Sequence, residues 1–268
     1  MYRHILIPAS QAADVEPMIR FAATLLDPDG EIRVLHVIPT PTLPQLAREW
    51  RSSINYVIPS HETAAALDIR VDPEVRVARD VAGEILDSAE THAVDAILMT
   101  LRGDKRSRNP FVGHTASALL HHAAPDVLIV NRLAIAEQQI PRILIPTFSS
   151  TTPPRALQIA EEFSMRNGGI PIVEITIARR GGPKAPPEEP SRSPRGLPLQ
   201  HRRSFISESI LFRRRRLPEL IVSQAARERF GLLLVGEEPV HGEGPLLTRT
   251  FLEELFRAAP CPVMAVRD

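Results

Sequence analysis

Short apolar runs alternate along the chain with longer stretches whose apolar residues recur every three or four positions. The runs predict buried strands, and the stretches predict amphipathic helices. In the first half the predicted strands are Ile5–Pro8, Ile32–Ile38, Glu74–Ala78, Ala96–Thr100 and Val127–Val130. The predicted helices are Ala12–Leu26, Pro44–Leu67, Ala82–His92 and a helix that follows Gly113 and ends at about Ala123. Strands that are apolar on both faces and separated by helices indicate a parallel sheet covered by helices.

The second half of the chain repeats this pattern. Positions 85 and 221, 100 and 236, and 127 and 263 carry corresponding residues, and each pair is separated by 136 residues. A constant separation over that distance indicates two copies of one domain. We therefore predict two tandem three-layer α/β/α domains, residues 1–133 and 140–268, each with a five-stranded parallel sheet.

The two copies differ after their second strand. In the second copy this strand is predicted at Ile172–Ala178 and the third at Ser209–Phe212. Between them, residues 179–203 are rich in Pro, Gly, Ser and Arg and replace the long helix of the first copy. Such a composition buries too little apolar surface to offset the entropy of ordering, so we predict a disordered insert at about 179–203.

The composition sets limits on the class of protein. Lys plus Arg and Asp plus Glu are both 32, so the overall charge argues for neither nucleic acid nor a membrane surface as a partner. The single cysteine, Cys261, excludes an internal disulfide and is interpreted as a small buried side chain. No apolar run approaches the roughly 18 residues of a membrane helix, and no signal-peptide segment precedes the first strand. We therefore expect a cytoplasmic protein without a membrane span.

One strongly basic segment offers a possible surface for anions. Residues 201–203 (His-Arg-Arg) and Arg213–Arg216 lie close together in the second copy and could attract RNA or an anionic surface. No aromatic residues are interleaved for base stacking, because Phe205 and Phe212 are better explained as core residues. Solvation of the charges is the simpler interpretation, so we expect no nucleic acid or anionic surface at this Arg-rich insert.

The candidate chemistry lies in the loop after the fourth strand, because ligands of parallel α/β sheets bind beyond the carboxyl ends of the strands. In the first copy Thr100-Leu101-Arg102-Gly103 is followed by nine residues and then by Gly113-His114-Thr115. Glycines let backbone amides approach a phosphate, and a helix N-terminus favours anions. The basic side chains Arg102, Lys105, Arg106 and Arg108 either hold phosphates or form a solvated loop. The glycines themselves are alternatively turn and cap residues.

The strand ending in proline, this loop, the helix after it and a His-Ala pair before the last strand together resemble the universal stress protein family. The resemblance covers nearly the whole chain except the insert and implies a Rossmann-like fold. Nucleotide-binding members carry Gly-x-x-Gly, nine residues and Gly followed by Ser or Thr, with an adenine-contacting Asp two residues after the first strand's proline. In the first copy Thr100 replaces the first glycine, His114 replaces the hydroxyl residue, and Ser10 replaces the Asp.

The second copy departs further from the family pattern. It keeps Gly236 and the final hydroxyl of Thr250, whereas Pro239 and Arg249 replace the other two glycines and Phe148 replaces the Asp. Pro239 also removes an amide donor. The resemblance therefore implies ATP or another adenine nucleotide as the candidate ligand of the first copy only, with no metal beyond a nucleotide-bound Mg. The implied contacts are Pro8, Ala9, Ser10, Val37, Ile38, Thr100, Arg102, Gly103, Gly113, His114 and Thr115.

The expected function is non-enzymatic. No Walker-type loop, nucleophile elbow or catalytic acid–base pair is present, and His36, His121 and His122 lack the spacing of a metal site. The resemblance implies a regulatory or stress-response binding protein whose two copies pack as an internal pseudo-dimer, with Val127–Val130 against Val263–Val266. The alternative is a protein-interaction scaffold or transporter-regulating module that binds no nucleotide.

Overall fold

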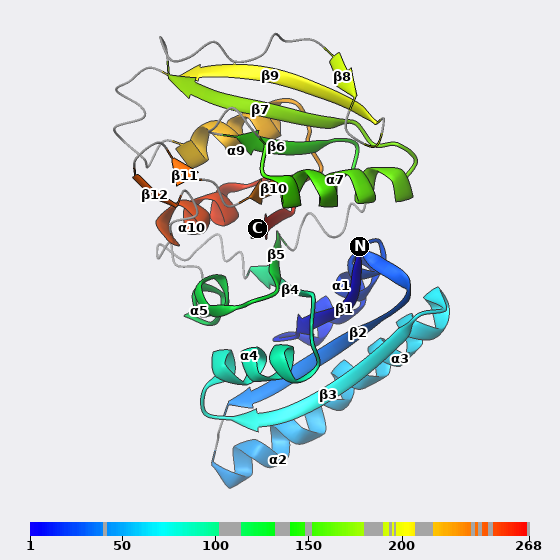
Figure 1. The fold of residues 1–268 in the computed structure, drawn as a ribbon. Helices are drawn as coiled ribbons and strands as arrows, with labels where there is room; N and C mark the ends of the chain where they lie inside the picture. The colour runs from blue at the N-terminus through cyan, green and yellow to red at the C-terminus, as the bar shows by residue number, and fades with distance from the viewer. Residues whose placement is uncertain are drawn as a thin grey trace. The chain divides into compact units, whose positions relative to one another are not determined.

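A computed structural model shows an α/β protein that divides into two compact units, one formed by the described residues up to Leu128 and one by those from Ile129 on (Figure 1). The structure describes residues 1–39, 42–101, 114–131, 140–147, 152–179, 190–192, 195, 197–206, 217–236, 239–240, 243–245 and 249–266. The strands and helices of each unit are described in turn, and β5, which crosses the boundary after Leu128, is taken with the first unit.

The first unit has a sheet with the strand order β3-β2-β1-β4-β5. The strands are β1 (Tyr2–Pro8), β2 (Leu26–Pro39), β3 (Arg70–Ala78), β4 (Ala96–Leu101) and β5 (Asp126–Asn131). β1 runs parallel to β2 and β4, and β2 runs parallel to β3. The predicted parallel sheet is therefore confirmed. The apolar side chains of β1 and β4 are buried, as expected for central strands that are covered on both faces.

Helices cover both faces of this sheet (Figure 1). They are α1 (Val15–Ala23), preceded by the 3-10 turn η1 (Ala12–Asp14), α2 (Leu43–Ser52), α3 (Ile54–Leu67), α4 (Val81–Thr91) and α5 (His114–His122). On one face α1 packs against α3, and on the other α4 packs against α5. This arrangement is the predicted three-layer sandwich.

Three boundaries in the first unit differ from the predictions. The first helix ends at Ala23 instead of Leu26, and β2 already begins at Leu26, so Gly30 lies within an irregular start of the strand. A Cβ atom at Gly30 would lie 2.8 Å from the carbonyl oxygen of Arg3, so only glycine lets the two strands approach there. The long helical stretch consists of two helices, α2 and α3, that meet at Ser53, whose hydroxyl donates to the Trp50 carbonyl while its backbone keeps helical dihedral angles.

The third strand also begins earlier than predicted, at Arg70 instead of Glu74. Its added residues, Arg70–Pro73, include two charged residues and a proline, and the apolar pattern therefore did not indicate them. Asp72 pairs in register with Arg33 of β2, and the two side chains form an ion pair of 2.5 Å. Charged cross-strand pairs of this kind let an edge strand continue without an apolar face.

The second unit has a sheet with the strand order β13-β10-β6-β7-β9-β8. Its strands are β6 (Ile143–Thr147), β7 (Ile172–Arg179), β8 (Pro190–Arg192), β9 (Pro198–Ile206), β10 (Leu232–Gly236) and β13 (Val263–Val266). Its helices are α7 (Pro154–Arg166), α9 (Leu217–Arg227) and α10 (Arg249–Ala258). A separate short ribbon is formed by β11 (Pro239–Val240) and β12 (Glu243–Pro245).

The prediction for the insert is corrected by this sheet. The strand parallel to β7 is β9, Pro198–Ile206, and not the predicted Ser209–Phe212, which lies outside the described residues. The end of the predicted disordered insert is therefore a sheet strand, paired along its whole length from Ile172 with Leu199 to Arg179 with Ile206. β8 adds an antiparallel edge strand, so this sheet has one strand more than the predicted five parallel strands. Residues 180–189 lie outside the described residues.

Apart from β8, the two sheets have the same topology. In chain order within each unit, the first strand lies between the second and the fourth, the third strand flanks the second, and the fifth flanks the fourth. The helix before the fourth strand is Val81–Thr91 in one unit and Leu217–Arg227 in the other, displaced by 136 residues at both ends. Cys261 is buried, as interpreted, and burial raises the pKa of its thiol to about 12. No helix in the described ranges is both long and apolar enough to cross a membrane.

Candidate functional site

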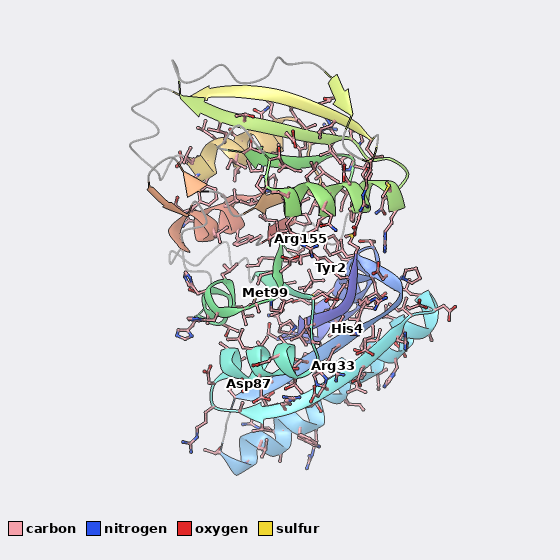
Figure 2. All side chains as sticks on the ribbon, in the orientation of Figure 1. Tyr2, His4, Arg33, Asp87, Met99 and Arg155 are labelled. Atoms are coloured by element: carbon pink, nitrogen blue, oxygen red, sulfur yellow. The ribbon has the colours of Figure 1, made fainter. Side chains whose placement is uncertain are left out.

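The predicted site residues of the first unit gather at the carboxyl ends of β1, β2 and β4. Pro8 pairs in register with Leu35, and the amide of Ala9 donates to the Leu35 carbonyl at 2.9 Å. β2 therefore continues past the end of β1, and its Val37 and Ile38 lie beyond the last paired residues. In Figure 2, Tyr2 and His4 mark the opposite, amino end of β1, and Met99 marks the end of β4 just before Thr100. The structure thus brings the strand-end residues of the prediction to one edge of the sheet.

The five strand-end residues differ in exposure. Ser10 is exposed, Pro8 is half-buried, and Ala9, Val37 and Ile38 are buried. The side chain of Ile38 is fully buried, so only its backbone could meet a ligand, as the prediction assumed. The polar group that this edge offers to solvent on β1 is therefore the Ser10 hydroxyl.

A histidine and a tyrosine close over the end of β1. The Nδ1 atom of His36 in β2 lies 3.0 Å from the Ala9 carbonyl oxygen, and the ring stacks on Tyr56 of α3 with centroids 3.9 Å apart. The Tyr56 hydroxyl donates to the Ser10 carbonyl at 3.3 Å. The carbonyl oxygens of Ala9 and Ser10 therefore both accept hydrogen bonds from side chains of the chain itself. Since Nδ1 must carry the proton to donate, the buried Nε2 of His36 is an acceptor, and it has no hydrogen-bond partner among the described atoms.

A carboxylate lies beside the end of β4. The Thr100 hydroxyl donates to Asp14 Oδ2 at 3.4 Å, and Asp14, in the turn η1 that follows β1, is buried. Thr100 stands at the first glycine of the family motif, so a polar contact has replaced bare backbone at this position. A carboxylate here opposes the approach of a phosphate, because like charges repel most strongly where water is excluded.

The helix after the motif loop begins where the sequence predicts. α5 starts at His114, directly after Gly113, with His114 exposed and Thr115 half-buried. The first amides of a helix have no partner within it, so this end can bind an anion. The predicted contacts Arg102, Gly103 and Gly113 lie outside the described residues, and so do Lys105, Arg106 and Arg108.

The equivalent edge of the second unit is filled by apolar packing. Gly236, the counterpart of Thr100, ends β10 against Pro153 at the start of α7. A Cβ atom at Gly236 would lie 2.6 Å from Pro153 Cγ and closer still to Pro153 Cβ. At the end of β6, Thr147 is buried and donates to Thr176 Oγ1 at 3.1 Å. Phe148, the counterpart of Ser10, lies outside the described residues.

The sequence did not indicate three residues at the carboxyl edge of the first unit's sheet, which are Asp14, His36 and Tyr56. Asp14 stands before an amphipathic helix, where an acidic residue is ordinary, and nothing in the sequence placed it beside Thr100. His36 was considered only as a metal ligand, and Tyr56 lies in a long helical stretch with no motif. No set of three or more His, Cys, Asp or Glu side chains within the described ranges is placed to hold a metal ion. One hydrogen bond to the Asp14 carboxylate comes from the Thr100 hydroxyl of the chain itself.

Comparisons with known proteins give the family of the first half and the fold of the whole. Residues 1–131 match the model of the universal stress protein family. A universal stress protein from Archaeoglobus fulgidus is 18% identical with a TM-score of 0.70, covering 98% of this chain and 96% of that chain. No curated protein matches the chain.

Two further solved structures share the fold over nearly the full length. A protein of unknown function from Pseudomonas aeruginosa is 13% identical with a TM-score of 0.55, covering 99% of this chain and 92% of that chain. The cytoplasmic domain of a prokaryotic cation chloride cotransporter is 10% identical with a TM-score of 0.53, covering 99% and 95%. Identities this low establish the fold alone. Through its first half, residues 1–131, the chain belongs to the universal stress protein family.

Proposed function

We propose that this protein is a non-enzymatic regulatory binding protein whose first unit binds an adenine nucleotide, ATP or a close relative. The supporting observation is the difference between the two edges. In the first unit the hydroxyls of Ser10 and Thr100 and the start of α5 lie at the carboxyl ends of the strands, whereas Pro153 fills the same place in the second unit. Among the described residues, the first edge offers the exposed Ser10 and the half-buried Thr100, whereas the hydroxyl of Thr147 at the second edge is buried and bonded to Thr176.

In this proposal the phosphates lie at the N-terminus of α5, where unpaired amides and the helix dipole favour negative charge. Thr115 supplies the hydroxyl that His114 cannot, and the four basic residues of the preceding segment are proposed to hold the phosphates. The base lies at the ends of β1 and β2, where Ser10 replaces the family's Asp and His36 Nε2 offers an acceptor. A nucleotide-bound Mg would be the only metal.

The two units are, in this proposal, copies of one ancestral domain that have diverged in function. Supporting it are the shared strand order and the displacement of 136 residues between equivalent helices. The second copy has lost the nucleotide site. Its packing against the first copy through the last strands, as an internal pseudo-dimer, stays a prediction.

A second candidate function is a protein-interaction or transporter-regulating module that binds no nucleotide. The observation favouring it is that the Ala9 and Ser10 carbonyls are already bonded to His36 and Tyr56. The fold shared with the cytoplasmic domain of a cation chloride cotransporter is compatible with such a role. On this hypothesis the glycines of the motif serve only as turn and cap residues.

The experiment that tests the proposal begins with freshly purified protein that is denatured and assayed for released nucleotide by mass spectrometry. The refolded or nucleotide-free protein is then titrated calorimetrically with ATP, AMP and a cyclic nucleotide. A near-stoichiometric nucleotide or a saturable titration supports the proposal. An empty protein with no titration signal contradicts it and favours the second candidate.

A pair of matched variants assigns the site. Gly113→Asp places a carboxylate at the N-terminus of α5 and should abolish nucleotide binding, because it repels the phosphates. Arg249→Asp makes the same residue at the equivalent position of the second unit and should leave binding unchanged. Circular dichroism checks that both variants remain folded. Equal affinity in Gly113→Asp and the parent protein would show that the phosphates lie elsewhere.

A further inference from the structure

Helices α2 and α3 carry a row of large apolar side chains on their exposed side. Trp50 is 56% exposed, Ile54 51% and Ile58 47%. Their spacing of four residues places them on one side of a helical segment. Ser53, between the two helices, keeps right-handed helical dihedral angles, and its amide donates to the Glu49 carbonyl at 2.9 Å. The helical course therefore continues from α2 into α3, and the three side chains form one apolar stripe.

This stripe is unusual within the molecule. Five large apolar side chains are exposed among the described residues, and the stripe contains three of them. A fourth, Val77, lies at the end of β3, the strand against which α3 packs, and only Met165 belongs to the second unit. Single exposed apolar residues are ordinary, but a contiguous set marks an interaction surface.

The two ends of the stripe differ in charge and in size. At its start lie the exposed arginines Arg48 and Arg51, next to the bulky Trp50. At its far end lie the exposed acids Glu62 and Asp68, with the small, exposed Ala65 and Ala66 between them. In the described part of the chain none of these four charged side chains forms an ion pair. The basic, bulky end is therefore complementary to the acidic, small end.

We propose that the apolar stripe is an interface with a second copy of this chain, in which the two helical segments pack antiparallel about a two-fold axis near Ile58. In such a pairing, residues equally far from Ile58 in opposite directions face each other. Trp50 then faces Ala66 of the other copy, which is a large side chain opposite a small one. Arg48 faces Asp68.

The remaining charges fit the same register. Arg51 faces Ala65 of the other copy. Glu62 faces Ile54 in this register and lies one helical turn from Ala65, so its carboxylate is within reach of the Arg51 guanidinium at the edge of the stripe. Every such contact occurs twice, because the interface is isologous. An anionic lipid surface is a poorer occupant, because Glu49, Glu62 and Asp68 interrupt the basic character that binding to such a surface requires.

The interface is small, so the association should depend on concentration. One helical stripe on each copy covers less than the roughly 1,200 Å² that stable interfaces bury, and weak interfaces of this class have micromolar dissociation constants. Charged side chains at the rim of the interface fix the register in which the two helical segments pair, and they add less to the affinity. The proposal concerns association between copies and does not rest on nucleotide binding, and its test measures molar mass alone.

The test measures the molar mass of the full chain in solution by sedimentation velocity over a dilution series from roughly 100 µM downward, a range chosen to bracket a micromolar dissociation constant. The parent protein should change from dimer to monomer on dilution, and Trp50, the only tryptophan, should report the change by fluorescence. Ile58→Glu places two carboxylates together at the axis and should remain monomeric throughout. Met165→Glu is the matched control, since Met165 has the same exposure of 47%, and should dimerise like the parent.

A charge exchange tests the register. Arg51→Glu alone and Glu62→Arg alone should each weaken dimerisation by about tenfold, as expected for the loss of ion pairs counted twice. The double variant with both changes should restore it, because the pair is re-formed in reverse. A parent protein that is monomeric at every concentration, or a dimer that Ile58→Glu leaves intact, overturns the proposal. So does a double variant that fails to restore the dimer, or a monomeric parent protein that binds vesicles containing anionic lipid.

Discussion

The carboxyl edges of the two sheets have the same topology and opposite chemistry. At the end of the fourth strand of the first unit, the hydroxyl of Thr100 bonds to the buried carboxylate of Asp14. At the equivalent position of the second unit, Gly236 packs directly against Pro153. One edge thus retains polar groups and the other has become part of a core. A shared strand order therefore preserves the position where a ligand could bind at the carboxyl ends of the strands. A few side chains determine whether polar groups are available at that position.

The largest expected effect comes from giving the second unit the residue of the first. Gly236→Thr should lower the free energy of unfolding by about 3 kcal/mol, because its Cβ clashes with Pro153 and overpacked cores are strained. Urea denaturation followed by circular dichroism measures the change. The reciprocal variant Thr100→Gly should cost only about 1 kcal/mol, for one long hydrogen bond and added backbone entropy. Similar losses in both variants would mean that the two edges are equally packed.

The charge at the first edge gives the next effect. Asp14→Asn removes the buried carboxylate while keeping an acceptor for the Thr100 hydroxyl. If phosphates approach this edge, ATP affinity should rise by about tenfold, or about 1.4 kcal/mol, because a repelling charge is lost. Isothermal titration calorimetry of the two proteins at matched ionic strength measures the difference. An affinity that falls, or that stays the same, would place the phosphates away from Asp14.

Cys261 gives a smaller effect, confined to the second unit and to alkaline pH. Burial raises the pKa of its thiol to about 12 in the folded protein, from an ordinary value of 9.0. The unfolded chain ionises first, so the stability contributed by the neutral thiol is complete below pH 9 and is lost as the pH rises from 9 toward 12. At pH 10 the loss should be about 1 kcal/mol relative to Cys261→Ala, measured by urea denaturation of both proteins. Rapid alkylation of native Cys261 at pH 8 would show that the thiol is not buried.

The sequence predicted the apolar part of each strand of the first unit better than its polar start. Ala96–Thr100 was found to within one residue because this central strand is apolar on both faces, whereas β1 begins three residues before the predicted Ile5 and β2 six residues before the predicted Ile32. Edge strands can carry charged side chains where a central strand is apolar, and the apolar pattern therefore did not indicate that β3 begins at Arg70. β9 was also missed, because its arginines and the surrounding prolines resemble the composition of a disordered segment.

The candidate site could be predicted only along the backbone. A strand ending in Pro8 and a helix beginning at His114 follow from local patterns, so the positions of Ser10 and Thr115 were foreseeable. The contacts that control the site are long-range. Thr100 and Asp14 are separated by 86 residues and His36 and Ala9 by 27, and no local pattern indicates that such pairs meet.

The sequence by itself determined most of the order of strands and helices, because burial of apolar faces selects the secondary structure locally. Its motifs also indicated the family of residues 1–131, and they predict, without testing it, the place where a ligand would bind. Only the tertiary structure decided that Asp14 accepts from Thr100, that the Ala9 and Ser10 carbonyls bond to His36 and Tyr56, and that Pro153 fills the equivalent place in the second unit by apolar packing. Those contacts join residues from different elements, and it is packing that brings them within hydrogen-bonding distance.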